Sequence, residues 1–388
     1  MPEPAFDFVL DGRTVRVEGV PANTTLLAWL RATGRTGTKE GCAEGDCGAC
    51  SVALVDTNAH GERTYRAINS CITLLPMVAG REIVTVEGLA TPEGLHPVQA
   101  AMVEHYGSQC GYCTPGFVVS MFEAYYREDI DPRSDAARVK VGDQLNGNLC
   151  RCTGYRPIRD AMMTALGRRR DGDLFQLRLK KAEGAVPALS YEAGGQTFLR
   201  PTSVDELLAI KAEHRERAEL VAGATEIGVY INKQNRRYPL LVSTEGVHEL
   251  SRIERNEKLW MVGGAATLTA LEEALDGEYP MIDKMLWAFA SRQIRNRATL
   301  AGNLVTASPI GDMPPVLLAL DANLVLDKAG GSRSVPLSEF FLGYRETALE
   351  PDEVVRWIVF PRNVDAPGLR RRMASYKVSK RRELDISI

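Results

Sequence analysis

Four cysteines between residues 42 and 71 constrain the fold of this chain more than any other feature. They follow the spacing C-x4-C-x2-C, with the last cysteine twenty residues further on: Cys42, Cys47, Cys50 and Cys71. Glycines alternate with them in the run GCAEGDCGAC, and glycine adopts backbone angles that let a chain wrap around one centre. The spacing is typical of a plant-type [2Fe–2S] cluster. A zinc site usually shows two C-x2-C pairs, of which one is present here, and disulfides are the other alternative.

Composition predicts a multidomain protein with redox or metal chemistry at one end. A chain of 388 residues with 45% hydrophobic content is long enough for about two or three domains. The net charge of −3 gives no reason to expect a nucleic-acid partner. The N-terminus is not a secretory signal and no apolar run is long enough to cross a bilayer, so we expect no membrane partner and a cytoplasmic location. All 8 cysteines lie in the first 152 residues, which favours metal or redox chemistry there over disulfides.

The first part of the chain has the pattern of a small β-rich domain. Alternating apolar and polar residues predict four strands, of which the first two form a hairpin: residues 6–10, 14–18, 51–55 and 83–86. Thr24 or Thr25 is expected to cap a short helix over residues 26–30. Strands around one helix, with the cysteines in a loop, predict a ferredoxin-like β-grasp domain over residues 1–88.

A second group of four cysteines lies at the starts of two predicted helices. Cys110 and Cys113 occur in QCGYCTPGF, and Cys150 and Cys152 occur in GNLCRCTGYRPI. The helices are expected over residues 117–126, with Thr114 as the N-cap, and over residues 158–166. The positive ends of helix dipoles favour a thiolate-bound cluster. A disulfide within C-x-C would be strained, and zinc is the alternative.

Residues 167–194 are charged and show no periodicity, which predicts an irregular interdomain linker. A helix capped by Ser203 is expected next, over residues 204–217. Two glycine-containing stretches follow. In LVAGATEIG an apolar strand leads into a turn bounded by glycines, and ATLAGNLVTASPIGD is rich in small residues. Such backbone can cradle a diphosphate, although an ordinary strand–turn–helix and a buried turn-rich segment are the alternatives. Neither stretch is a Rossmann G-x-G-x-x-G sequence.

Together these stretches resemble one known family. GCAEGDCGAC, QCGYCTPGF and GNLCRCTGYRPI, in this order, are similar to the iron–sulfur region of the molybdenum hydroxylases, which include xanthine dehydrogenases, aldehyde oxidases and carbon monoxide dehydrogenases. LVAGATEIG and ATLAGNLVTASPIGD resemble the FAD domain of the same family. The resemblance covers nearly all of the chain. It implies a multidomain α+β fold with a β-grasp ferredoxin domain, a four-helix [2Fe–2S] domain and an α+β FAD-binding domain of the PCMH or vanillyl-alcohol-oxidase type.

The resemblance also implies cofactors and the residues that hold them. One [2Fe–2S] cluster would be held by the four cysteines of residues 42–71, and a second by Cys110, Cys113, Cys150 and Cys152. The residues expected at the FAD site are Leu220, Val221, Ala222, Gly223, Ala224, Thr225, Glu226, Ile227, Gly228, Phe289, Thr299, Leu300, Ala301, Gly302, Asn303, Asp312, Val355 and Lys377. Gln109 matches the family position that touches the pterin of molybdopterin. No catalytic residue is expected in this chain, because the molybdenum site would belong to a partner.

The expected domains are residues 1–88, 89–168, a linker at 169–190, the FAD-binding domain at 191–372, and the start of a C-terminal flavin subdomain at 373–388, apparently truncated. The order of the parts resembles the small subunit of a bacterial xanthine dehydrogenase. Electrons would then pass from molybdopterin on a large subunit through both clusters to FAD and NAD+, as xanthine and hypoxanthine are oxidised to urate. The expected assembly is a heterotetramer of two small and two large subunits. The alternatives are a relay for an aldehyde or N-heteroaromatic hydroxylase, a non-catalytic redox or assembly module, and a zinc-binding scaffold.

Overall fold

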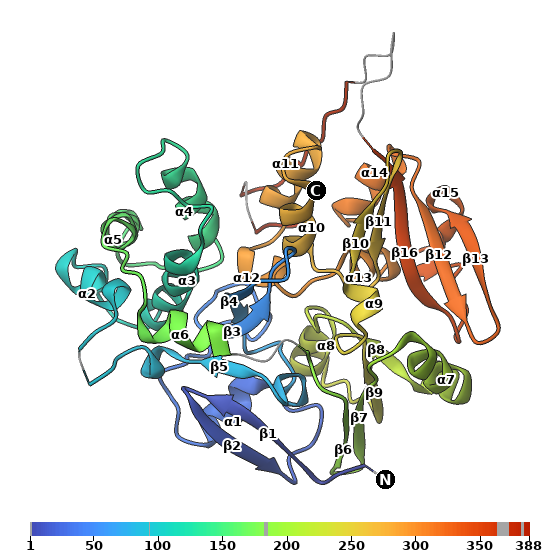
Figure 1. Ribbon diagram of the computed structural model, residues 1–388, viewed down its shortest axis with the longest axis horizontal. Helices are drawn as coiled ribbons and strands as arrows, with labels where there is room; N and C mark the ends of the chain where they lie inside the picture. Colours follow the sequence, from blue (N-terminus) through green and yellow to red (C-terminus); the bar gives the residue numbers. More distant parts are fainter. Residues whose placement is uncertain (1, 93, 182–184, 363–371, 382–383) are drawn as a thin grey trace.

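The computed structural model describes residues 2–92, 94–181, 185–362, 372–381 and 384–388. The N-terminal part is a five-stranded sheet in the order β2-β1-β5-β3-β4 with one helix packed on it (Figure 1). Its elements are β1 (Ala5–Leu10), β2 (Arg13–Glu18), α1 (Leu26–Ala32), β3 (Ser51–Thr57), β4 (Arg63–Asn69) and β5 (Glu82–Val84). The predicted hairpin is confirmed by the pairing of β1 with β2, and Thr25 caps α1 by accepting a hydrogen bond from the Ala28 N–H at 3.2 Å.

Two details of this sheet differ from the sequence prediction. The strand expected over residues 83–86 ends at Val84, because the Thr85 N–H donates instead to the Asp11 carboxylate at 2.7 Å. Strand β4 was not predicted, since arginines interrupt its alternation. The Arg66 side chain is nevertheless buried, because it pairs with Glu273 at 2.6 Å.

Helix α3 (Thr114–Tyr126) packs against the other side of this sheet, and three further helices pack around α3: α2 (Pro97–Glu104), α4 (Ala137–Leu145) and α5 (Arg156–Gly167). Helix α3 is the central one, and all of its residues from Gly116 to Tyr125 are buried. Its Phe122 ring lies 4.7 Å from the Tyr65 ring of β4, so the sheet and the helices share one hydrophobic core. Helix α3 begins earlier than predicted. Cys113 takes the N-cap position, and the Thr114 hydroxyl donates to Ser108 at 2.8 Å rather than capping the helix.

The segment after α5 is more ordered than its composition suggests. The prediction of an irregular segment is wrong for α6 (Leu174–Lys181) and β6 (Leu189–Ala193). Asp173 starts α6 by accepting hydrogen bonds from the N–H groups of Phe175 and Gln176 at 3.0 and 2.9 Å. Phe175 is buried 5.0 Å from the Phe122 ring, so a tertiary contact stabilises a helix with little local signal. Residues 182–184 of the expected linker lie outside the described residues.

The rest of the chain forms two further sheets (Figure 1). The first has the order β6-β7-β9-β8 and contains β7 (Gln196–Arg200), α7 (Val204–His214), β8 (Glu219–Val221), α8 (Ile227–Gln234) and β9 (Leu240–Ser243). Ser203 caps α7 as predicted, by accepting from the Glu206 N–H at 3.2 Å. The helix ends at His214, and residues 215–217 form a 3-10 turn instead of the predicted last helical turn.

The second sheet has the order β10-β11-β16-β12-β13 and encloses the largest hydrophobic core of the described chain. Its strands and helices, with the small β14–β15 ribbon, are α9 (His248–Ser251), β10 (Ile253–Arg255), β11 (Leu259–Gly263), α10 (Leu268–Leu275), α11 (Pro280–Ala288), α12 (Arg292–Arg295), α13 (Leu300–Val305), α14 (Met313–Leu318), β12 (Asn323–Lys328), β13 (Gly331–Pro336), α15 (Leu337–Phe340), β14 (Phe341–Gly343), β15 (Glu346–Thr347) and β16 (Val354–Pro361). No helix in the described ranges is long and apolar enough to cross a membrane.

Candidate functional site

The first cysteine group lies in the loop between α1 and β3 and in the turn after β4. The Cys42 thiol is close to the thiols of Cys47 and Cys71, and the Cys50 thiol is close to that of Cys71. Hydrogen bonds from the Cys47 and Cys71 thiols hold the pKa of Cys42 far below its usual range. The backbone N–H groups of Glu44 and Cys47 also point at Cys42 Sγ, at 3.5 and 3.3 Å. The loop therefore surrounds its sulfur atoms with hydrogen-bond donors, as a negatively charged centre requires.

Glycine is necessary at two points of this loop. A Cβ atom at position 41 would lie 2.6 Å from Cys47 Sγ. At position 48 the backbone has a φ of 66°, and a Cβ atom there would overlap the Gly147 carbonyl oxygen. The first contact keeps the loop closed around its thiols, and the second lets another loop approach it.

The second cysteine group is formed by the loops before α3 and α5. The Cys113 thiol is close to that of Cys150, and the Cys110 thiol is close to that of Cys152. Burial, followed by the hydrogen bond to Cys150, raises the pKa of Cys113 to about 12. For Cys150, burial would raise the pKa, but hydrogen bonds from the Thr153 hydroxyl and N–H outweigh it and lower the pKa. Cys110 and Cys152 are exposed, as is Gln109 beside them.

The arrangement of the thiols fits iron–sulfur clusters. All eight cysteines are free thiols within the described residues. Within each group the thiols lie close to one another: Cys42 with Cys47 and Cys71, Cys71 also with Cys50, Cys113 with Cys150, and Cys110 with Cys152. A [2Fe–2S] cluster has two irons, each with two protein thiolates, so each group of four offers a suitable donor set.

The two cysteine loops touch each other. The Leu149 N–H donates to the Cys47 carbonyl oxygen at 3.0 Å, and the Asn148 side-chain amide donates to the Gly48 carbonyl oxygen at 3.0 Å. The Tyr112 hydroxyl donates to the Glu40 carbonyl oxygen. Leu149, next to Cys150, thus binds the backbone of Cys47, a cysteine of the other group.

The stretch Leu220–Gly228 runs from β8 through a turn into the start of α8. Ala224 in the turn has a φ of 60°, and a Cβ atom on Gly223 would overlap the Arg297 carbonyl oxygen. The Thr306 hydroxyl donates to Glu226 Oε2 at 2.5 Å. The structure therefore brings the two glycine-containing stretches together, as the sequence analysis expects for a flavin site.

The segment Thr299–Asn303 forms the start of α13. Thr299 caps this helix by accepting from the Gly302 N–H at 3.0 Å. The Asn303 Oδ1 atom is buried, and it has no hydrogen-bond partner among the described residues. A buried acceptor without a described partner, in the helix that Thr306 follows and links to Glu226, fits a site that holds a polar ligand.

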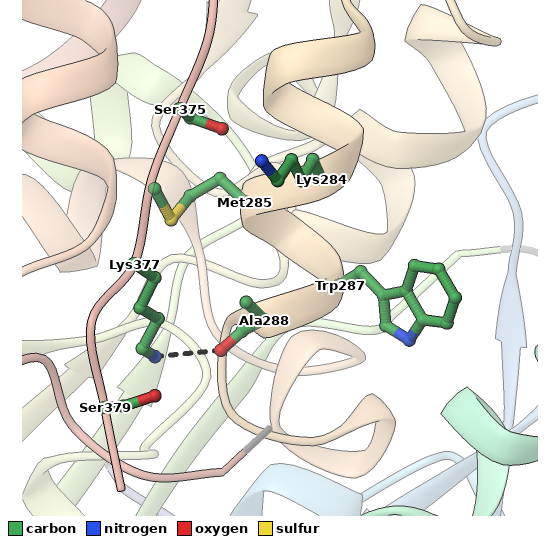
Figure 2. Close-up of a pocket in the computed structure, with 7 residues that line it drawn as sticks. All are labelled: Lys284, Met285, Trp287, Ala288, Ser375, Lys377 and Ser379. Carbon is green, nitrogen blue, oxygen red and sulfur yellow. Dashed lines mark hydrogen bonds between the residues drawn. The ribbon is translucent and has the colours of Figure 1, made fainter. Parts of the chain in front are cut away.

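A third set of expected flavin residues meets at the C-terminal segment. Lys377 Nζ donates to Asp312 Oδ2 at 2.7 Å and to the Ala288 carbonyl oxygen, next to Phe289, at 2.8 Å. Figure 2 shows the Lys377 side chain reaching the end of α11, beside a cavity of about 310 Å³ that Lys284, Met285, Ser375 and Ser379 also line. The Lys377 and Asp312 side chains are 5% and 9% exposed, so this is a buried ion pair.

Some expected residues have mainly packing contacts. Val355 lies in β16, within the hydrophobic core that also contains Leu300 and Ala301. Val221 belongs to the core beneath the first sheet, and Leu220 packs at the edge of a smaller core. All five of these expected residues contribute to hydrophobic cores.

Sequence reasoning missed several polar residues that join the parts. Gln293 of α12 donates to Asn148 Oδ1 at 2.8 Å, and Asn232 of α8 donates to the carbonyl oxygens of Ala43 and Cys71. A cavity of about 740 Å³ between the β3–β4 hairpin and the sheets that follow was also missed, although Gly223 and Thr299 line it. No local signal could reveal these contacts, because their partners lie more than a hundred residues away in the sequence.

Comparisons with known proteins agree with this geometry. Three family models match: a 2Fe-2S iron-sulfur cluster binding domain at residues 8–75, a [2Fe-2S] binding domain at 85–163, and an FAD binding domain in molybdopterin dehydrogenase at 191–363. The xanthine dehydrogenase of Emericella nidulans is 35% identical over 443 residues, covering 98% of this chain and 32% of that protein. The xanthine dehydrogenase/oxidase of Mus musculus is 31% identical over 437 residues, with 98% and 32% coverage. The chain therefore spans about a third of the length of these relatives.

A solved structure, reconstituted CO dehydrogenase from Oligotropha carboxidovorans, overlaps 48% of this chain and 65% of its own with a TM-score of 0.43 and 23% identity. The expected fold class, with two iron–sulfur domains and an FAD-binding domain, is confirmed by the three family models. The chain therefore carries a 2Fe-2S iron-sulfur cluster binding domain, a [2Fe-2S] binding domain and an FAD binding domain of the kind found in molybdopterin dehydrogenase, in this order.

Proposed function

We propose that this chain is the electron-transfer subunit of a molybdenum hydroxylase of the xanthine dehydrogenase kind. Molybdopterin would belong to a partner subunit, and NAD+ would be the final acceptor. When bound, the two clusters would carry single electrons and the flavin would pass a pair of electrons on as hydride. The observation that carries the proposal is a continuous series of contacts. The loop before α5 binds the first cysteine loop, and Ile72 of the first cysteine group packs against Gly228, which follows the turn of residues 222–226.

The proposed ligands are the residues expected from the sequence. The first cluster would be held by Cys42, Cys47, Cys50 and Cys71, and the second by Cys110, Cys113, Cys150 and Cys152. FAD would lie along Leu220–Gly228 and Thr299–Asn303, with Phe289, Asp312, Val355 and Lys377 completing its site. We also keep as proposals the domain division at residues 88, 168 and 190, and the assignment of residues 373–388 to a flavin subdomain.

The exposure of the cysteines indicates which of the two clusters would face the partner subunit. Cys50 and Cys71 are buried against the part of the chain that follows, whereas Cys110, Cys152 and Gln109 are exposed. The exposed group is therefore the one that a partner subunit can approach. Gln109 would contact the pterin from this surface. In this orientation, residues of this chain exclude water from the first group, while the partner would cover the second.

The names of the relatives support xanthine as the substrate. Xanthine and hypoxanthine would both be oxidised to urate. A paired heterotetramer of small and large subunits in the cytoplasm is the assembly that we propose. The substrate itself would bind the partner, so a relay for an aldehyde or an N-heteroaromatic compound uses the same residues of this chain. An activity screen of the complex, with each substrate class in turn, separates these possibilities.

The test is to purify the chain together with its candidate large subunit and to measure iron, sulfide, flavin and xanthine-dependent NAD+ reduction in one sample. We expect about four iron and four sulfide atoms per chain, since each [2Fe–2S] cluster contributes two of each. Iron sufficient for only one cluster, or zinc in place of iron, contradicts the relay. Reduction of NAD+ by aldehydes but not by xanthine keeps the relay and rejects the purine substrate.

A further inference from the structure

We propose that Asn232 is a positioning residue that fixes the first cysteine loop, residues 42–50 with Cys71, against helix α8 and thereby tunes the cluster that this loop would hold. The inference rests on the proposed function, since it concerns the cluster assigned there. Asn232 is not among the residues that the family resemblance points to, and it does not touch a thiol.

The contacts of Asn232 are specific. Its single side-chain nitrogen, Nδ2, donates to the Ala43 carbonyl oxygen at 2.9 Å and to the Cys71 carbonyl oxygen at 2.6 Å. These acceptors are 28 residues apart in the sequence: Ala43 directly follows the first cysteine of the group, and Cys71 is the last. One amide therefore uses both of its hydrogens to bridge the two segments that supply the cysteines.

The place of Asn232 on α8 links this bridge to the flavin turn. Helix α8 begins at Ile227, directly after the turn, and Gly228 and Asn232 are four residues apart on one helix face. A Cβ atom on Gly228 would lie 2.6 Å from the Cα atom of Ile72. Val229 packs against the buried side chains of Cys50, Cys71 and Ile72. This face of α8 therefore packs closely against the first cysteine group, and Asn232 makes its hydrogen bonds to that group.

The Ala43 contact explains how Asn232 can act on the sulfur atoms. Ala43 has a φ of 57°, in the left-handed region that a residue with a Cβ atom rarely adopts. This conformation lets the next N–H groups, those of Glu44 and Cys47, point at Cys42 Sγ. Hydrogen bonds to thiolate sulfurs favour the more negative, reduced form of a cluster. Loss of the Asn232 bond would let Ala43 relax, weaken these bonds and make the cluster harder to reduce.

The experiment compares Asn232→Leu and Asn232→Ser with the wild-type holoenzyme and with Gln234→Ala, an exposed side chain on the same helix. Leucine has a similar size but no donor, and serine is a polar residue too short to reach both carbonyl oxygens. The midpoint potentials and electron paramagnetic resonance spectra of both clusters are measured in each sample by titration with dithionite. The rate of flavin reduction is measured by stopped flow.

We expect both Asn232 variants to lower the potential and alter the spectrum of the first cluster only, and to slow flavin reduction roughly tenfold. The second cluster is the internal reference and should keep its potential. Serine is easily accommodated at this half-buried position, so it supplies the measurement if the leucine variant does not fold. Potentials, spectra and rates equal to those of Gln234→Ala in both variants would overturn the inference. A wild-type sample without two clusters would instead reject the proposed function, before any variant is compared.

Discussion

Gly228 lies so close to Ile72 that a Cβ atom at position 228 would come within 2.6 Å of the Ile72 Cα atom. Gly228→Ala must therefore move α8 away from the first cysteine loop. We expect this variant to lose about 1–3 kcal/mol of the free energy of unfolding, as overpacked sites do, and to retain less flavin. Urea denaturation and the flavin content of the purified protein measure the two effects.

Gly142→Ala is the matched control. Gly142 lies within helix α4, and apart from its chain neighbours and the helix backbone no described heavy atom lies within 4 Å of the added Cβ atom. This change should be neutral or stabilise the chain by roughly 0.4–1 kcal/mol, since alanine loses less entropy on folding. Equal behaviour of the two alanine variants would show that the Gly228 contact is not tight.

Asn148 joins both cysteine loops to helix α12. It is 1% exposed, donates to Gly48, and accepts hydrogen bonds from Ser120 and Gln293 at 2.6 and 2.8 Å. Asn148→Ala removes three buried hydrogen bonds, although the Gly48 carbonyl keeps its bonds from Ser51 and Gln293 keeps its bond to Ser120. The loss should therefore be about 0.5–1.5 kcal/mol for each bond removed. We expect a lower urea midpoint and altered spectra of both clusters, in contrast to the exposed Gln234→Ala variant. Unchanged spectra would argue that the loops keep their positions without this amide.

The Lys377–Asp312 pair should be important for stability because it is buried. Lys377→Met removes one partner and leaves a buried carboxylate, which typically costs about 3–5 kcal/mol. The double variant with Asp312→Asn should recover part of this loss, because no unpaired charge remains. Lys328→Met is the control, since the Lys328–Glu350 pair has the same general geometry but side chains that are 39% and 50% exposed. That change should cost much less than Lys377→Met, because solvent screens an exposed pair. Thermal unfolding with flavin analysis tests all three variants.

His96 predicts a pH dependence of the four-helix region. Its imidazole is buried, accepts from the Val98 N–H and contacts the Tyr126 hydroxyl, and this burial lowers its pKa from 6.5 to about 4. Between these two values the unfolded chain binds a proton that the folded chain does not. The free energy of unfolding should therefore fall as the pH drops from about 6.5 towards 4, by up to about 1.4 kcal/mol per pH unit. The difference in the free energy of unfolding between pH 7 and pH 5, measured by urea denaturation, should be smaller for His96→Gln than for the wild type. An equal difference in the two proteins would exclude His96 as the cause.

Single cysteine variants should separate the two clusters. Cys152→Ser changes an exposed residue, so we expect loss of the second cluster with the first cluster and the flavin retained. Cys71→Ser changes a residue that is 2% exposed and packed against α8, so it should remove the first cluster and block flavin reduction. Iron content should fall by about half in each variant. Loss of both clusters from Cys152→Ser would mean that the two sites do not assemble independently.

Much of the candidate site was predictable because its signals are local. Cysteine spacing, the glycines between them and the strand–turn–helix over residues 219–234 depend on neighbours in the sequence. The elements that were missed depend on distant partners. Strand β4 contains Arg66, whose pairing with Glu273 no local pattern reveals, and α6 is held by the packing of Phe175 on Phe122. A polar or charged residue reads as exposed until its partner is known.

The sequence by itself determined which residues can act as thiolate ligands, and in how many groups, because a loop that closes around a centre needs its cysteines and glycines at fixed short spacings. It did not determine what lies against the Cys42–Cys71 loop. That was decided by tertiary packing. Gly228 leaves room for the Ile72 backbone, Asn232 binds the carbonyl oxygens of Ala43 and Cys71, and Asn148 binds that of Gly48. Such contacts require complementary surfaces from segments far apart in the chain, and only the folded structure brings those surfaces together.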